Sequence, residues 1–191
     1  PGKVFKTRVN KRKVYGGGGI RPDVVVEPER RPRLVVELMR KGLFFDFAVE
    51  FATVKSFPAR FEDYELSENI VDQFWTFIAD SANANGFAYK SSTQMQVVEL
   101  NQALEEKGVL NDSDAAAMDQ LSQIAERERK NDYKKAEPYI RHEIEQELAN
   151  RVWGTKGKIL ASLKGDKQFQ EAVRILKDRT TYNQKMALVE E

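Results

Sequence analysis

The sequence predicts a mainly α-helical protein with a small β-hairpin segment at its N-terminus. Residues 4–26 mix apolar and basic residues at near period two and contain four consecutive glycines, a pattern typical of strands joined by turns. From residue 33 onward, apolar residues recur at spacings of three and four, which is the period of an α-helix. Between these patterns, residues 27–33 (E-P-E-R-R-P-R) hold two prolines and dense charge, and they indicate a domain border.

The N-terminal segment is expected to form a strand, a glycine turn and a second strand. Apolar and basic residues alternate over 4–9 and 12–15, and Val24–Val26 is a β-branched run suited to a buried strand. Glycine tolerates positive φ, so Gly16–Gly19 would allow a sharp turn. Because a lone hairpin is marginally stable, we expect it to belong to a larger sheet. Its exposed edges would then pair with another copy in a homo-oligomer, or stay disordered.

Five to seven helices are expected after residue 29. They run from Pro32 to Gly42, Leu43 to about Val54, a Ser67 cap to Asn83–Gly86, the Ser91–Thr93 start to Lys107–Gly108, an Asn111–Asp114 start to about Ala136, Pro138 to Gly154, and an Asp166 cap to Leu176 or on through Tyr182, Met186 and Leu188. Their expected inner faces include Phe44, Phe47, Ala48 and Phe51; Ile70, Phe74, Phe77 and Ile78; Met118, Leu121, Ile124 and Ala125; Ile140, Ile144, Leu148 and Val152; and Phe169, Val173 and Leu176. Residues 57–65 are interpreted as a connecting loop, and Pro138 is expected to break or kink the chain.

Composition narrows the classes of function. The chain has 191 residues, 41% of them hydrophobic, which is enough for one good core or two small ones. Its 31 basic and 30 acidic residues leave a net charge of +1, which argues against a general nucleic-acid or membrane-surface role. The absence of cysteine excludes disulfides, zinc–thiolate sites and a thiol nucleophile. No apolar run approaches the ~20 residues of a membrane span.

Residues 5–23, F-K-T-R-V-N-K-R-K-V-Y-G-G-G-G-I-R-P-D, resemble a segment of the carboxyl-terminal processing, or tail-specific, serine proteases. In many members a phrase of the type T-x-x-G-R-x-V-Y-G-G-G-G-I-x-P-D closes the protease domain. Here N-K-R-K at 10–13 replaces the usual Gly-Arg pair. Residues 42–48, G-L-F-F-D-F-A, and 173–178, V-R-I-L-K-D, resemble the helical tail of the larger bacterial members.

The resemblance implies a serine nucleophile and a lysine general base, both upstream of the glycine phrase. Catalytic, cofactor and metal residues are therefore expected to be absent from this chain, which begins in mid-phrase at Pro1 as a piece of a longer protein would. Residues 1–28 would be the last strands of the protease core, and 29–191 a helical domain that braces the core or contacts the protein substrate, an adaptor or another subunit. The resemblance also implies a periplasmic or cell-envelope location. An independent helical interaction module without a peptidase link is the alternative.

Individual candidate residues favour structural interpretations. Ser91–Ser92 is interpreted as a helix start rather than a nucleophile, and Ser67 and Ser113 as caps. His142, between Arg141 and Glu143, is interpreted as an exposed helix residue, because a metal site or a Ser–His pair would need further partners. The glycine run precedes I-R-P rather than G-K-[S/T], which disfavours nucleotide binding. A solvated hairpin face is favoured over a nucleic-acid patch for the basic residues Lys3, Lys6, Arg8, Lys11, Arg12, Lys13 and Arg21.

Overall fold

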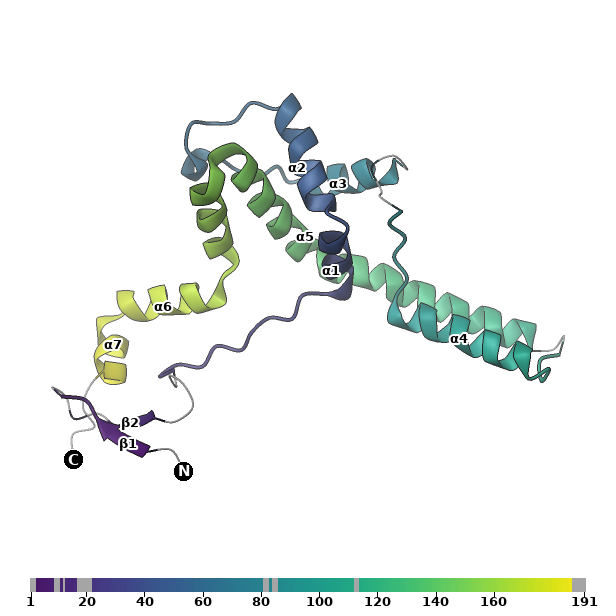
Figure 1. The fold of residues 1–191 in the computed structure, drawn as a ribbon, viewed down its shortest axis with the longest axis horizontal. Helices are drawn as coiled ribbons and strands as arrows, with labels where there is room; N and C mark the ends of the chain where they lie inside the picture. Colours follow the sequence, from purple (N-terminus) through teal and green to yellow (C-terminus); the bar gives the residue numbers. More distant parts are fainter. Residues whose placement is uncertain are drawn as a thin grey trace. The chain divides into compact units, whose positions relative to one another are not determined.

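The structure is a computed structural model that describes residues 3–8, 11, 13–16, 22–80, 83, 86–111 and 114–186. Its described residues form one antiparallel hairpin and seven α-helices (Figure 1), which confirms the predicted fold class. By internal contacts the chain divides into two compact units. Unit 1 joins residues 1–29 to 163–191, and unit 2 is residues 30–162. In the part that is described, no helix is both long and apolar enough to cross a membrane.

The hairpin of unit 1 turns earlier in the sequence than predicted. Strand β1 (Lys3–Lys6) pairs with β2 (Lys13–Gly16), with Lys6 opposite Lys13 and Lys3 opposite Gly16. The turn therefore lies between Lys6 and Lys13, where the Lys11 N–H donates to the Thr7 carbonyl at 3.1 Å. Placing the hairpin's connecting turn in the glycine run was wrong, because β1 pairs with β2, which ends at the first glycine of that run. Gly17–Gly19 of that run, with Ile20 and Arg21, lie outside the described residues.

The Val24–Val26 run is not a strand, which corrects a second expectation. A strand needs a neighbouring edge for its backbone hydrogen bonds, and β-branched side chains cannot supply one. Strands β1 and β2 pair with each other, and the described residues contain no third strand. Val25 is accordingly 71% exposed. The prediction that this segment requires a larger sheet stays untested.

Two helices complete unit 1. Helix α6 (Lys167–Lys177) begins where the Asp166 carboxylate accepts the backbone N–H groups of Gln168 and Phe169 at 2.8 and 3.0 Å, as predicted. A second helix, α7 (Arg179–Met186), follows instead of a continuation. Its start is fixed by Asp178, whose carboxylate accepts the N–H groups of residues 180 and 181. Leu188, expected to extend this pattern, lies outside the described residues.

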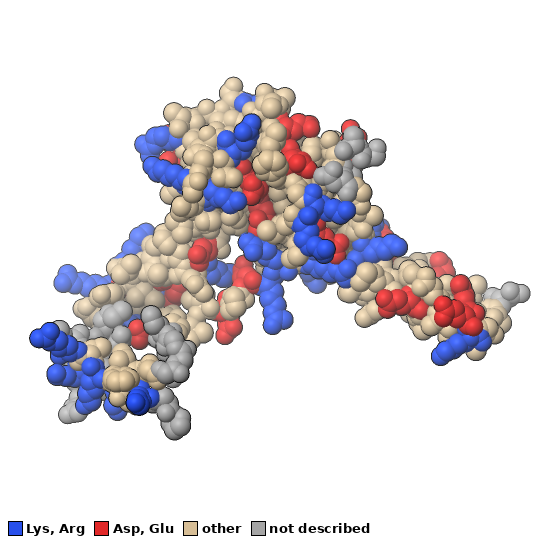
Figure 2. Space-filling model, viewed as in Figure 1, with Lys and Arg blue, Asp and Glu red and all other residues tan. Residues whose placement is uncertain are grey.

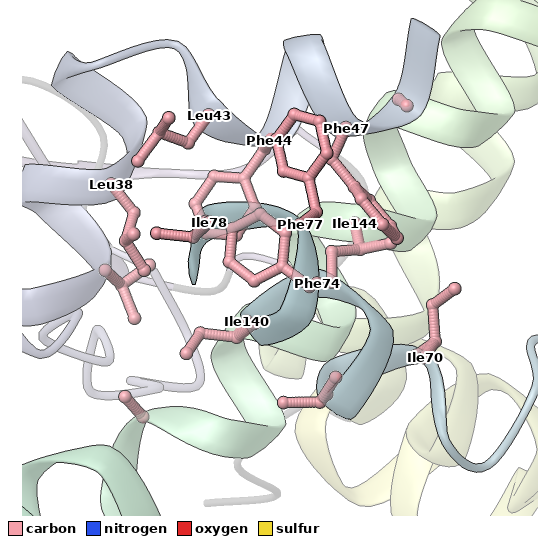
Figure 3. Close-up of a cluster of buried hydrophobic side chains, with 14 of the residues drawn as sticks. Leu38, Leu43, Phe44, Phe47, Ile70, Phe74, Phe77, Ile78, Ile140 and Ile144 are labelled. Atoms are coloured by element: carbon pink, nitrogen blue, oxygen red, sulfur yellow. The ribbon is translucent and has the colours of Figure 1, made fainter. Parts of the chain in front are cut away.

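The core of unit 2 forms where α1 (Arg33–Arg40), α2 (Leu43–Val54) and α3 (Ile70–Ala79) bury their apolar sides together with part of α5 (Ala115–Gly165). Figure 3 shows its centre, where Phe74 stacks on Phe44 with ring centroids 5.0 Å apart. Phe47 meets the edge of Phe74 at 5.3 Å. The predicted stripes on α2, on α3 and at 140–148 of α5 are confirmed as buried.

The two ends of α3 differ from the prediction. Ser67 does not cap it, because the Ser67 hydroxyl donates to Asn69 Oδ1 at 2.5 Å and Asn69 is the residue before the helix. The helix ends at Ala79, with Asp80 extended, several residues before the expected glycine stop. Gly86 does take a left-handed φ of 67°, but in the connection that follows. Ala84 and Asn85 lie outside the described residues. The expected loop at 57–65 contains a short 3₁₀ helix, η1 (Phe61–Asp63).

Helix α4 (Ser92–Glu106) runs antiparallel alongside the first part of α5 (Figure 1). Cross-helix hydrogen bonds join Ser91 to Glu128 and Gln94 to Glu126, so the start of α4 lies level with residues 126–128 of α5. We call α4 together with residues 115–130 of α5 the arm, with its tip at the α4–α5 connection. Asp112 and Ser113 in that connection lie outside the described residues.

Helix α5 continues through Pro138, so of the break or kink predicted there the break is wrong. Proline removes the hydrogen bond to the carbonyl four residues earlier, here that of Lys134. Both Pro138 and Lys134 are exposed, so water can reach that carbonyl. The backbone instead leaves helical angles at Gly154, with φ 66° and ψ −159°, a region that is essentially restricted to glycine.

Candidate functional site

Ser91 is a buried helix cap, as predicted for the Ser91–Ser92 pair. Its hydroxyl accepts the Gln94 N–H at 3.1 Å, and the Gln94 side chain accepts the Ser91 N–H at 3.0 Å, which together make a capping box. The same hydroxyl donates to Glu128 Oε2 at 3.1 Å. Both functions of the hydroxyl are thus engaged in holding the base of the arm, where its hydrogen-bond partners are a backbone N–H and a carboxylate.

Replacing Ser91 with alanine is expected to lower the free energy of unfolding by about 1–2 kcal/mol, because one cap is lost and Glu128 loses a donor. Ser92→Ala is the matched control, since Ser92 is exposed in the first turn of the same helix. Its effect should stay within about 0.5 kcal/mol. Urea unfolding followed by circular dichroism measures both variants. Equal stability of the two would contradict the capping assignment.

The remaining candidate residues do not converge on a site. Ser67 takes part in the turn before α3, and Ser113 lies outside the described residues. His142 is partly buried on α5 rather than exposed as predicted, because its helix packs against α3. In the described part of the chain, no group of three or more His, Cys, Asp or Glu side chains could hold a metal ion.

A polar network joins the arm to the aromatic core of unit 2. The Tyr89 hydroxyl donates to Asp132 Oδ2 at 2.6 Å, and burial, followed by this hydrogen bond, raises the pKa of Tyr89 above its usual value. Arg129 binds both carboxylate oxygens of Glu126, at 2.7 and 2.8 Å. Its guanidinium lies 5.5 Å from the centroid of the Tyr133 ring. The Tyr89–Asp132 bond ties the segment before α4 to α5.

Sequence analysis missed two long-range contacts of α5. The Arg141 guanidinium donates to the carbonyls of Leu66, Ser67 and Glu68 at 2.7–3.2 Å, which holds the loop before α3 against α5. Glu143 is 7% exposed and binds Arg31 at 2.8 Å. The sequence did contain a signal for the Arg31–Glu143 contact. Glu143 stands three residues after Ile140 and so lies next to the buried stripe, where a carboxylate needs a partner.

The hairpin carries basic side chains beside exposed apolar ones. Figure 2 shows Lys and Arg gathered over it. Val4, Phe5 and Tyr15 are each more than half exposed. A Cβ atom added to Gly16 would lie 2.7 Å from the Phe5 ring, so this ring packs across the glycine backbone. The basic side chains and three large apolar side chains are thus exposed on the same hairpin.

Open depressions lie on each of the two units. One of about 580 Å³ in unit 1 is lined by Val24–Val26 and by Lys167, Gln170, Glu171 and Arg174 of α6. Another of about 430 Å³ in unit 2 lies between Arg40, Lys41 and residues 86–88. Neither lining contains a serine or histidine, so neither depression offers a hydroxyl nucleophile.

The chain is thus mainly helical, with an aromatic core and a short hairpin. The hydroxyl, carboxylate and guanidinium groups described above make contacts that hold its helices and loops together. Residues 34–176 match the family model described as "Probable PDZ-protease, C-terminal helical domain". The match spans well over half of the chain, from α1 to α6, and the chain belongs to this family. It confirms the resemblance to the C-terminal part of a protease. No curated protein and no solved structure matches the chain.

Proposed function

We propose that this chain is the non-catalytic C-terminal region of a carboxyl-terminal processing serine endopeptidase. The family match over residues 34–176 is the observation that carries the proposal, because it names a helical domain of a protease. The phrase at 5–23 adds the protease class, since it resembles the segment that closes the catalytic domain of the carboxyl-terminal processing enzymes. The parent enzyme would act on protein or peptide substrates in the bacterial periplasm or cell envelope.

The hairpin supports a place at the end of a protease core. Every residue of β1 is exposed, although the strand contains Val4 and Phe5. A two-stranded hairpin with exposed apolar side chains on β1 and β2 is expected to be covered by further strands or helices. In the parent enzyme these strands would complete the sheet of the catalytic domain.

The helical part would brace that core or contact substrate, adaptor or another subunit. Its packing suits a brace, because Phe44, Phe47 and Phe74 interlock with the buried stripe of α5. The ion pair between the exposed Arg31 and the buried Glu143 adds a contact at the start of the unit, just beside α1. Chemistry in the parent would need a serine beside a lysine whose pKa is lowered by desolvation, a pair that the proposal places upstream of residue 1.

An independent helical interaction module is the second candidate. The observation in its favour is that unit 2 has its own core and separates from the hairpin by internal contacts. The reading frame upstream of Pro1 distinguishes the two functions. A serine and a lysine in protease context, preceded by a peptide-binding module, support the protease region. A reading frame without them supports the module.

A further inference from the structure

Little apolar burial holds α4 against α5. Helix α4 is described over its whole length of 15 residues, and none of them is buried. In the part of α5 that runs alongside, the first buried residue is Ala125. Val98 and Leu100 of α4 are 43% and 45% exposed. Burial of apolar surface is the dominant favourable term in folding, so other contacts have to keep α4 in place.

Hydrogen bonds join α4 to α5, and they lie at one end of the helix. Glu128 of α5 accepts hydrogen bonds from Thr93 and Ser91, and these bonds, led by that of the Thr93 side chain, lower the pKa of Glu128. Gln94 donates to Glu126 at 3.0 Å. Among the described residues, these cross-helix bonds involve the cap and the first turn of α4. We call the bonds to Glu126 and Glu128 the latch.

Beyond the latch, a polar residue interrupts the partly buried side of α4. Val97 and Leu104 lie on this side at helical spacing, and Asn101 lies between them. The Asn101 side chain donates to Glu105 of the same helix at 2.7 Å. A polar residue in the middle of a contact between two helices lowers the stability of that contact. The latch is therefore the main attachment of α4 to α5.

The two helices of the arm are anchored differently. Helix α5 continues from the arm into the core of unit 2, where Ala136, Ile140 and Ile144 are fully buried. Its arm part extends an existing helix, and extension needs no new nucleus. Helix α4 begins at the Ser91 cap and ends just before a turn in which Gly108 has a φ of 61°. It has to form on its own, and an isolated helix of this length is marginal in water.

Ala125 marks the part of α5 that α4 covers. Its side chain is 1% exposed, but it belongs to neither of the two buried apolar clusters of the described residues. The element that runs alongside this part of α5 is α4 (Figure 1). Met118, seven residues before Ala125 and on the same side of the helix, is partly buried. Moving α4 away would uncover this side of α5.

We propose that α4 releases from α5 as a separate local unit when the latch breaks, while α5 stays helical and the core of unit 2 stays folded. The opened form presents the side of α5 that carries Met118 and Ala125, next to Leu121 and Ile124, which are exposed already. The arm is thus a conformational device with a closed and an opened form. The inference is independent of the protease function, since it uses the arm alone.

Hydrogen exchange on the full chain, followed by mass spectrometry of its peptides, tests the release. Amides of residues 96–106 should exchange at least roughly 100-fold faster than those of residues 140–149, because the latter open only when the core unfolds. Residues 118–124 of α5 should exchange more slowly than residues 96–106. Equal rates in α4 and the core overturn the proposal, and so does exchange of α4 at the rate of an unfolded peptide, which would show that no closed form exists. Exchange in 118–124 as fast as in α4 would show that the whole arm melts, and would overturn it as well.

A pair of variants tests the latch in the same experiment. Glu128→Ala removes the acceptor of Ser91 and Thr93, and it should speed exchange in residues 96–106 by about tenfold. Glu137→Ala is the matched control, because Glu137 is an exposed carboxylate of the same helix outside the arm. It should leave these rates within about threefold of wild type. Equal effects of the two variants would contradict the latch.

Cysteine labelling tests which surface the release uncovers, since the chain has no cysteine of its own. Ala125→Cys should react with a maleimide at least roughly tenfold faster than Ala136→Cys, because position 125 is uncovered by release of α4 and position 136 only by unfolding of the core. Both positions are buried alanines of α5, and circular dichroism checks that both variants keep their helices. Adding Glu128→Ala to Ala125→Cys should speed the reaction further. Equally slow labelling at the two positions would show that α4 stays closed until the core unfolds, and would overturn the proposal.

Discussion

Phe74→Ala should remove about 3–5 kcal/mol of unfolding free energy, because it empties the centre of the core of unit 2. Phe74 is fully buried and contacts the rings of Phe44 and Phe47 at centroid separations of 5.0 and 5.3 Å. Its loss removes the transfer free energy of the ring and leaves a cavity that three helices cannot close without moving. Chemical denaturation of the whole chain, followed by far-UV circular dichroism, measures the change.

Phe45→Ala is the matched control for this prediction. Phe45 lies in α2 beside Phe44 but is 58% exposed, so its removal leaves no cavity. We expect a loss of about 1 kcal/mol or less. A comparable loss for Phe45→Ala and Phe74→Ala would contradict the described core.

Gly157→Ala should destabilise the protein by about 1–3 kcal/mol, although alanine is ordinarily the better helix former by about 1 kcal/mol. A Cβ atom at this position would lie 2.6 Å from the Ala149 carbonyl oxygen and 2.7 Å from the Trp153 Cβ. Neither atom is the end of a flexible side chain, so the backbone itself would have to shift. Thermal and urea unfolding both report the change.

The sign of the change in unfolding free energy decides the Gly157→Ala prediction, because helix propensity and steric overlap act on stability in opposite directions. Lys156→Ala, at an exposed position next to it, isolates the propensity effect and should be near neutral. A Gly157→Ala variant more stable than wild type would show that the turn at Gly154 does not bring residues 149–153 against residue 157.

Local spacing was sufficient to predict most helices. Gly42 after Met39, the Ser91–Gln94 capping box and the Asp166 cap are each contained in a few consecutive residues, and the structure confirms all three. The buried stripes on α2, on α3 and at 140–148 of α5 were equally visible, because their period is a property of one helix. These features need no knowledge of the rest of the fold. The inner faces expected at 118–125 and 169–176 were wrong in large part, since Leu121, Ile124, Phe169 and Leu176 are exposed.

Features set by partners distant in sequence were not predictable in the same way. Pro138 is tolerated because its side of α5 is exposed, and Val24–Val26 is not a strand because the described chain offers it no edge. The contacts of Ser91 depend on a distant partner in the same way. Ser91 was predicted as a cap, but its bond to Glu128, 37 residues away, depends on how α4 lies against α5.

The most direct test of the protease assignment compares two purified proteins, this chain and the full product of its reading frame, on an unstructured protein substrate. The assignment predicts inhibitor-sensitive cleavage by the full product, and only buffer background from the 191 residues alone. The reason is that losing the nucleophile and base of such a unit costs roughly several powers of ten in rate. Cleavage by the chain alone, abolished by a serine-directed inhibitor, would make Ser67, Ser92 or Ser113 a nucleophile and contradict the assignment. A full product that is inactive and lacks a Ser–Lys pair would also contradict the assignment. That result would support an independent helical module.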